Sequence, residues 1–319
     1  MAKRSGIAAQ LGYKAETTWG TGVTVDRFLP FKKESLTANK GRLDSDSIYA
    51  NRLVRDSEQW DEAEITAGGD VELDVFTTGI GLFLKHALGA VNTTGSGPYA
   101  HAFTPAVLDG LGLTLQVGKP DRGGTVRPWN FVGSKIREWE LTVPAKEAAA
   151  LKLGISAKDL DKDGTPALQS WSPPAALARF TWAHATAATV HGASPKIKSL
   201  SIKGVNGIEV DRYFLGSQTI EEQDDVELRA YTAEVECEFG DETLFDAFWD
   251  GDEADVVLTL TRGAAILDVT GNARLDGDGA SPVVESRGKL TQKIPAVFVG
   301  DGTDADALTL TYTTTDATP

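Results

Sequence analysis

Twice along the chain, carboxylates alternate with apolar residues, and the pattern then changes to apolar residues at helical spacing. The first run is GDVELDVFTTGIGLFLKHALG (69–89) and the second is AEVECEFGDETLFDAFWDG (233–251). A period of two places alternate side chains on opposite faces of a strand, whereas spacings of three and four residues build one stripe along a helix. Each run therefore predicts a half-buried strand followed by an amphipathic helix, at 77–88 and 241–249, that ends at Gly89 or Gly251.

The polar positions of both predicted strands are occupied by carboxylates alone. They are Asp70, Glu72 and Asp74 in the first run and Glu234, Glu236 and Glu238 in the second. The solvent-exposed face of an antiparallel sheet explains why these positions are polar. It does not explain why Thr, Lys and Ser are absent from them, so the six acids are candidate functional residues.

Most of the remaining chain has the pattern of strands separated by Gly, Pro and Asp clusters, which predicts a mainly β fold. In the first half we expect strands at 27–31, 65–75, 100–104, 113–117, 127–132, 136–143 and 151–156. In the second half we expect them at 180–184, 197–202, 207–214, 227–239, 255–261, 266–275, 288–299 and 308–313. An amphipathic segment at 145–150 predicts one further short helix.

Recurring segments indicate an internal duplication. VDRFL (25–29) recurs within VDRYFL (210–215) with one residue inserted, and each copy precedes one of the strand–helix runs. The polar, turn-rich stretch 161–176 divides the chain and contains Pro173-Pro174, which cannot continue a ladder of strand hydrogen bonds. We therefore expect a first domain at 1–160, a linker at 161–176 and a second domain at 177–319, each domain flanked by one main helix.

The first half carries an additional segment, NKGRLDSDSIYANRLVRDSEQW (39–60). Its charges alternate in sign, and it also holds bulky apolar residues such as Ile48, Leu53 and Trp60. Loops longer than about 12 residues are usually functional or disordered. The apolar residues indicate that this loop folds against something.

Charge and composition argue against several classes of function. The 319-residue chain has a net charge of −15, whereas proteins that grip nucleic acid rely on Lys and Arg to displace phosphate counterions. Its single cysteine, Cys237, excludes an internal disulfide, indicates a reducing assembly compartment and alternates inward with Val235 and Phe239. No stretch approaches the ~20 apolar residues of a membrane span. The common hydrolase, nucleotide-binding and metal-binding motifs are missing, so we expect no catalytic residue, cofactor, metal or enzyme activity.

The succession of segments along the chain resembles one known family. AAQLGYKAETTWGTGVTVDRFLPFKKESL comes first, and GDVELDV…GLFLKHALG, HAFTP, LTLQVGKPD and GVNGIEVDRYFLGSQ follow in order. These segments are similar to the major tail tube protein of long-tailed, siphovirus-type phages, most of all those of actinobacterial hosts, from about residue 6 to the end of the sequence. The resemblance implies a β-barrel or β-sandwich domain flanked by a helix, and the duplication implies two such domains in tandem.

The resemblance also implies an assembly and its partners. Subunits would form rings whose inner sheets join into one barrel, and stacked rings would form the hollow tube through which DNA is ejected. A duplicated domain implies trimeric rings with pseudo-sixfold symmetry. The implied partners are other copies of the chain, a tape measure protein, a tail terminator and distal tail or baseplate proteins, without a membrane. The protein would be part of the virion and assembled in the host cytoplasm.

Both unusual sequence features acquire a role in such a tube. We expect one or both rows of acids to face the lumen, where carboxylates would repel phosphates and let DNA pass without specific binding; the alternative places them on the tube exterior. The 39–60 segment is similar to a loop that reaches a neighbouring subunit or ring. Its candidate contact residues are Arg42, Ile48, Tyr49, Arg52, Leu53, Arg55 and Trp60.

A second class of function is a ligand-binding β-sandwich, such as a carbohydrate-binding module of a phage or bacterial surface protein. The seven Trp residues could provide stacking platforms for sugars. Trp139 and Trp249 lie in apolar patterns typical of a core, and the others are not clustered. The sequence therefore favours the tube protein.

Overall fold

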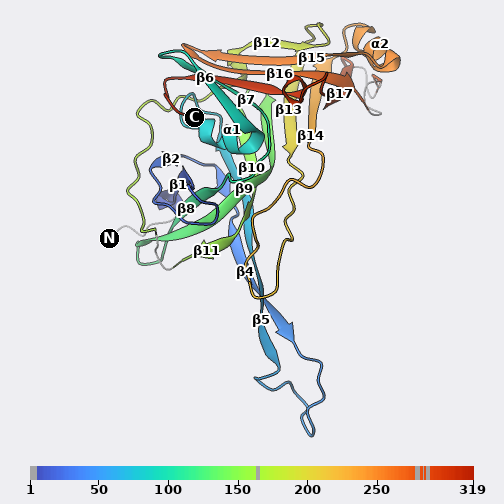
Figure 1. Ribbon diagram of the computed structural model, residues 1–319. Helices are drawn as coiled ribbons and strands as arrows, with labels where there is room; N and C mark the ends of the chain where they lie inside the picture. Colours follow the sequence, from blue (N-terminus) through green and yellow to red (C-terminus); the bar gives the residue numbers. More distant parts are fainter. Residues whose placement is uncertain (1–5, 163–165, 277–280, 283, 285–287) are drawn as a thin grey trace.

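Alternating side chains build a mainly β molecule with short helices (Figure 1). The computed structural model describes residues 6–162, 166–276, 281–282, 284 and 288–319. Every pair of named strands within these residues is antiparallel, and the strands form one hydrogen-bonded network. The mainly β fold class predicted from the sequence is confirmed. Residues 163–165 of the predicted linker lie outside the described residues.

The strands of the first half are β1 (Gln10–Ala15), β2 (Arg27–Leu29), β3 (Lys33–Glu34), β4 (Thr37–Asp44), β5 (Trp60–Asp74), β6 (Gly89–Thr94), β7 (Tyr99–Pro105), β8 (Leu113–Pro120), β9 (Val126–Pro144), β10 (Ala150–Ala157) and β11 (Asp159–Asp161). Those of the second half are β12 (Ala185–Val190), β13 (Ile197–Val205), β14 (Ala230–Glu238), β15 (Glu253–Arg262), β16 (Ala265–Leu275), β17 (Thr291–Phe298) and β18 (Thr309–Thr314). The helices are α1 (Gly81–Leu88), α2 (Thr243–Asp250), the one-turn α3 (Asp304–Ala307) and 3-10 turns at Gly6–Ala8 and Trp182–His184.

The long strand β9 joins the two halves of the sequence. It pairs with β8 and β11 along its first part, and with β10 and β13 along its later part. Because β5 pairs with β10 and β13 pairs with β14, one sheet runs continuously in the order β5–β10–β9–β13–β14–β17. A second connection pairs β7 of the first half with β18 of the second.

Each half also repeats one order of elements. In the first half, the hairpin β4–β5 leads into α1 and then the hairpin β6–β7. In the second half, the hairpin β13–β14 leads into α2 and then the hairpin β15–β16. The strand–helix junctions predicted from the two repeated runs are therefore present in both halves.

Apolar strand faces and α1 form a single core that extends through both halves. Val71 and Leu73 of β5, and Val235 and Cys237 of β14, are almost completely buried. Phe83 of α1 lies against the ring of Tyr13, with 4.4 Å between the ring centroids. The inward alternation predicted for the acidic strands is thus confirmed, and burial raises the pKa of the Cys237 thiol, as expected for a structural cysteine.

Three predicted elements are wrong, and local hydrogen bonds show why. Residues 145–150 do not form a helix, because Lys146 has a φ of 71° and the Ala149 N–H donates to the Phe180 carbonyl. Residues 180–184 end in a 3-10 turn rather than a strand, because the Thr181 N–H donates to the ring of His184. Residues 207–214 form no strand, since Gly207 with a φ of 61° ends the pairing of β13. The strands predicted at 127–132 and 136–143 are both part of β9.

Candidate functional site: a charged sheet face and a projecting arm

All six candidate acids lie on one face of the continuous sheet. In the strand registers, Asp74 is opposite Ala150, Ala150 is opposite Thr142, Thr142 is opposite Ser201 and Ser201 is opposite Glu234. Directly paired residues of neighbouring strands point to the same side of a sheet. The two rows of carboxylates are about 160 residues apart in sequence. They are therefore parts of a single surface, which we call the charged face and which contains Asp70, Glu72, Asp74, Glu234, Glu236 and Glu238.

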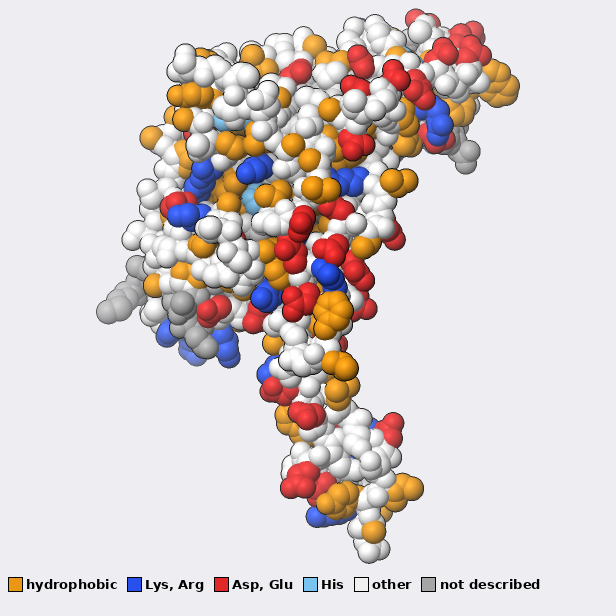
Figure 2. Space-filling model, in the orientation of Figure 1, with side chains coloured by type: hydrophobic (Ala, Val, Ile, Leu, Met, Phe, Trp, Pro, Cys, Tyr) orange, Lys and Arg blue, Asp and Glu red, His pale blue; other side chains and the backbone are white. Residues whose placement is uncertain are grey.

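Each of these carboxylates has a basic partner from a neighbouring segment. In the β5 row, Asp70 pairs with Lys152 at 3.1 Å, and Lys32 lies 3.1 Å from Asp74 and 3.9 Å from Glu72. In the β14 row, the pairs are Glu234–Lys293 at 3.4 Å, Glu236–Lys198 at 3.9 Å and Glu238–Lys289 at 3.0 Å. Figure 2 shows acidic and basic side chains intermixed above the root of the projecting arm.

Because of these ion pairs, the charged face carries charges of both signs rather than negative charge alone. A hydrogen bond from Lys289 lowers the pKa of Glu238, and a hydrogen bond to Asp70 raises the pKa of Lys152. Both shifts keep the paired groups charged. The sequence pattern located the acids but not their partners, because the lysines come from other strands and loops whose register is set by long-range pairing.

The 39–60 segment forms the tip and one side of a hairpin arm that projects from the body (Figure 1). It is not one long loop, because β4 continues to Asp44 and β5 begins at Trp60. The Arg42 guanidinium stacks over the Trp60 ring at 5.1 Å, which ties the two strands together near the tip.

Apolar side chains at the arm tip have no cover from the rest of the described chain. Ile48 is 99% exposed and Leu53 103% exposed, while Tyr49 and Trp60 are about half exposed. Arg52 and Arg55 form ion pairs within the arm, to Asp56 at 3.1 Å and Asp44 at 2.5 Å. All seven candidate contact residues thus lie on the arm.

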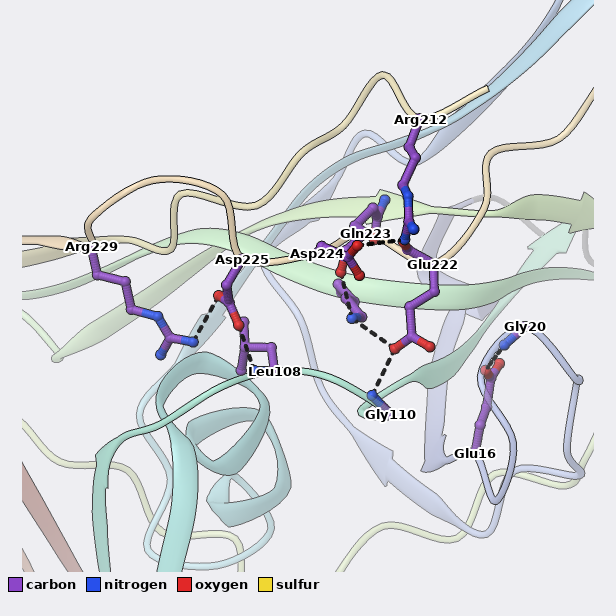
Figure 3. A network of polar contacts seen from close by, with 11 residues as sticks. Glu16, Gly20, Leu108, Gly110, Arg212, Glu222, Gln223, Asp224, Asp225 and Arg229 are labelled. Carbon is purple, nitrogen blue, oxygen red and sulfur yellow. Dashed lines mark hydrogen bonds and ion pairs between the residues drawn. The ribbon is translucent and has the colours of Figure 1, made fainter. Parts of the chain in front are cut away.

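A long segment between β13 and β14 was not recognised as functional from the sequence. Within residues 206–229, Glu222 and the carbonyl of Gln223 bind the buried Lys135 ammonium at 2.9 and 2.7 Å, and Glu222 also accepts the N–H of Gly110 (Figure 3). Asp225 accepts the N–H of Leu108 at 2.8 Å. These bonds fasten the segment onto β9 and the start of the connection to β8.

The same segment braces the root of the arm. The Ile65 N–H of β5 donates to the Gln218 carbonyl at 2.7 Å, and the Tyr213 hydroxyl donates to the Ile65 carbonyl at 2.9 Å. A separate contact holds the loop after β1 (Figure 3). The buried Glu16 carboxylate accepts the N–H groups of Gly20 and Gly133, and burial raises the pKa of this carboxyl group. These contacts position backbone segments rather than reacting groups.

One predicted core residue is on the surface. Trp139 is 2% exposed, as predicted, but Trp249 on α2 is 75% exposed, because no other described segment covers that side of the helix. Trp60 lies on the arm, Trp139 in the core and Trp249 on α2, so these three do not form one stacking platform. The arrangement does not favour a carbohydrate-binding module.

Among the described residues, no group of three or more His, Cys, Asp or Glu residues could hold a metal ion. None of their helices combines the length and the apolar character that crossing a membrane requires.

Comparison with known proteins identifies the family of the chain. Among curated proteins, no sequence matches the chain. A family model described as "Phage tail tube protein" matches residues 6–316, which is nearly the whole chain. The chain therefore belongs to the family of phage tail tube proteins, structural components of the virion that assemble into the tube of the tail.

Proposed function

We propose that the chain assembles into stacked rings that form the hollow tail tube through which phage DNA is ejected, with the charged face lining the lumen. The observation that carries this proposal is that both rows of carboxylates lie on one side of a sheet running through both halves of the chain. The opposite side of that sheet is occupied by the core. A sheet that is solvent-exposed on one side and continues through both halves of the chain suits the inner wall of a ring.

Open strand edges provide the means of closing the ring. Among the described strands, β4 pairs only with β5, and β17 pairs with β16 only over residues 296–298. Unpaired edges readily add a strand from another chain. Pairing each β4 edge with the β17 edge of the next subunit would close a ring by heterologous contacts, and stacked rings would make an open-ended tube. The repeated order of elements supports a tandem duplication and hence trimeric rings with pseudo-sixfold symmetry.

The ion pairs suggest how DNA passes without sticking. Affinity for nucleic acid comes mainly from Lys and Arg groups that replace the counterions of phosphates. On the charged face, Lys152, Lys198, Lys289 and Lys293 are each held by a carboxylate of this surface. The acids would thus repel phosphates and also occupy the lysines that could bind them. Assembly in the host cytoplasm on a tape measure protein, with a terminator and baseplate proteins at the two ends, completes the proposed role.

Cryo-electron microscopy of tubes polymerised from the purified chain tests the assembly. We expect three chains in each ring and the charged face on the inner wall. Six chains in each ring would contradict the trimeric arrangement, and a chain that never forms tubes would contradict the proposed function.

Ejection kinetics test the role of the charged face. Glu234→Gln, Glu236→Gln and Glu238→Gln together should free the paired lysines and slow DNA ejection at low salt, and added salt should restore the rate because it screens phosphate contacts. A matched control removes three exposed acids elsewhere, Asp301→Asn, Asp304→Asn and Asp306→Asn. Equal ejection rates for phage with the three Glu→Gln substitutions and phage with the three control substitutions would place the β14 acids away from the DNA.

A further inference from the structure

Across the charged face, acidic and basic residues alternate from one strand to the next. Glu72 of β5 is directly opposite Lys152 of β10, and Lys152 is opposite Glu140 of β9. Glu140 is in turn opposite Lys203 of β13. Because directly paired residues point to the same side of a sheet, these side chains form one line across four strands. We call Glu72, Lys152, Glu140 and Lys203 the alternating row.

Neighbouring acids hold both lysines of this row. The Lys152 ammonium lies 3.1 Å from Asp70, and the hydrogen bond between them raises the pKa of Lys152. The Lys203 ammonium lies 3.5 Å from Glu138. The side chains of Lys152 and Lys203 are 50% and 49% exposed. Both cations are therefore open to solvent, and each has a carboxylate beside it.

The alternation also places a carboxylate between the two lysines. Neighbouring strands are about 4.8 Å apart, so Lys152 and Lys203 stand about 10 Å apart with Glu140 on the strand between them. A phosphate that approaches either lysine therefore also approaches a carboxylate, and the attraction and the repulsion nearly cancel. Two lysines on adjacent strands would instead attract the same phosphate together.

We propose that the alternating order of charges in this row, rather than the number of acids on the charged face, keeps the wall from holding DNA. Affinity for nucleic acid grows with the number of lysines that can replace phosphate counterions. The alternation offsets repulsion between carboxylates of the sheet without offering two lysines to one phosphate. The inference rests on the proposed position of the charged face in the lumen. It makes Glu140 and Lys203, which no local sequence pattern singles out, determinants of DNA passage.

The strands beside the row allow a test with one added charge. Thr232 of β14 is opposite Lys203, so Thr232→Lys would place two lysines side by side and break the alternation. Ser201 is opposite Glu234, and its hydroxyl donates to Glu140 at 2.7 Å. Ser201→Lys would therefore place the new lysine between two carboxylates. Both substitutions add one positive charge to the same face at a partly exposed position.

Ejection kinetics compare phage carrying either substitution with unsubstituted phage, at about 50 and about 200 mM salt. Thr232→Lys should slow ejection at least about threefold at the lower salt concentration, and the difference should shrink at the higher one, because each lysine–phosphate contact weakens as about the 0.9 power of salt concentration. Ser201→Lys should leave the rate unchanged at both. Equal rates for the two variants at both salt concentrations would overturn the role of charge order.

A rearrangement of the row provides a second measurement if phage with Thr232→Lys lack tails. Lys152→Glu with Glu140→Lys keeps the net charge at −15 but leaves two acids followed by two lysines along the row. The matched control, Lys152→Gln with Glu140→Gln, removes the same pair of charges and also keeps the net charge. The rearranged row should slow ejection at the lower salt concentration relative to this control. The same rate for both would contradict the inference.

Cryo-electron microscopy of the tails used in these comparisons separates this inference from the proposed function. Equal ejection rates from tails whose inner wall carries the charged face would overturn the role of charge order and leave the proposed lumen intact. A charged face on the tube exterior would instead overturn the proposed lumen, and the inference with it.

Discussion

Helices α1 and α2 follow equivalent strands and have equivalent lengths, yet among the described residues α1 is enclosed while α2 is mostly exposed. Every residue of α1 except Lys85 is buried, whereas Leu244 is the single buried residue of α2. Helix α1 packs against β6, β7 and β9, while α2 contacts β16. The difference shows that an amphipathic stripe predicts a helix, but only the surrounding fold decides whether the stripe belongs to the core or to an interface.

The hairpins that precede the two helices differ in a related way. The tip of β4–β5 projects away from the body, while the segment joining β13 to β14 folds back along β5 and braces the arm. The first half therefore supplies the projecting arm. The second half supplies the segment that braces the arm and a helix that is mostly exposed among the described residues.

The largest predicted effect is a difference in the free energy of unfolding between a substitution in α1 and one in α2. Phe83→Ala in α1 should reduce the free energy of unfolding by about 3–5 kcal/mol, because it leaves a cavity in the core. Trp249→Ala in α2 should change it by no more than about 0.5 kcal/mol, because most of that side chain is already in water. Urea unfolding measures both values.

The folded fraction, measured by circular dichroism, provides the complementary readout. Trp249→Ala should leave it unchanged, whereas Phe83→Ala should lower it because the core loses packing. A large loss of stability in Trp249→Ala would mean that α2 is part of the core of the monomer, and the distinction between the helices would fail.

Local patterns explain which parts of the fold could be predicted from the sequence. The period of two identified the faces of β5 and β14, and Gly251 ends α2 in the left-handed conformation expected for a helix terminus. The fate of Trp249 could not be predicted, because its stripe is as apolar as that of α1. Its exposure depends on which distant segments reach the helix, and no local pattern encodes that.

Substituting Ala for the glycines that end the two helices should also lower the free energy of unfolding by unequal amounts. The difference should be smaller than that between Phe83→Ala and Trp249→Ala. Gly89 has a φ of 109°, and an added Cβ would collide with the carbonyl oxygen of Ala106. Gly251 has a φ of 71° with no atom within 4 Å of an added Cβ. Gly89→Ala should therefore cost about 3 kcal/mol, from strain and displacement of backbone together, and Gly251→Ala about 1 kcal/mol from strain alone. Equal losses in urea unfolding would show that α2 is as tightly enclosed as α1.

The candidate site shows the same limit of sequence reasoning. The six acids and the arm residues were located by periodicity and by the length of an inserted segment. Their grouping was not predictable, because Asp74 and Glu234 share a row only through the long-range register of β9. The lysine partners and the segment 206–229 depend on the same register, so composition alone overstated how acidic this surface is.

The smallest effect concerns a residue that exists in one helix only. His86 occupies the sixth position of α1, where α2 has Phe248. Neither ring nitrogen of His86 has a hydrogen-bond partner within the described residues, and burial, with help from Lys85 and Lys135, lowers its pKa from 6.5 to about 3. Above pH 6.5 this residue is neutral in both the folded and the unfolded chain, and its contribution to stability is fully present.

Below pH 6.5 the unfolded chain binds a proton at His86 that the folded chain does not bind until about pH 3. The free energy of unfolding should therefore fall by about 1.4 kcal/mol per pH unit from this residue as pH decreases through that window. His86→Leu, of similar volume, should remove this part of the slope, while His184→Leu at a partly exposed position should retain it. Urea unfolding between pH 7 and pH 5 measures the dependence of stability on pH. Parallel slopes for His86→Leu and the unsubstituted chain would mean that the imidazole is in contact with water. Helix α1 would then be less enclosed than its burial indicates, and more like α2.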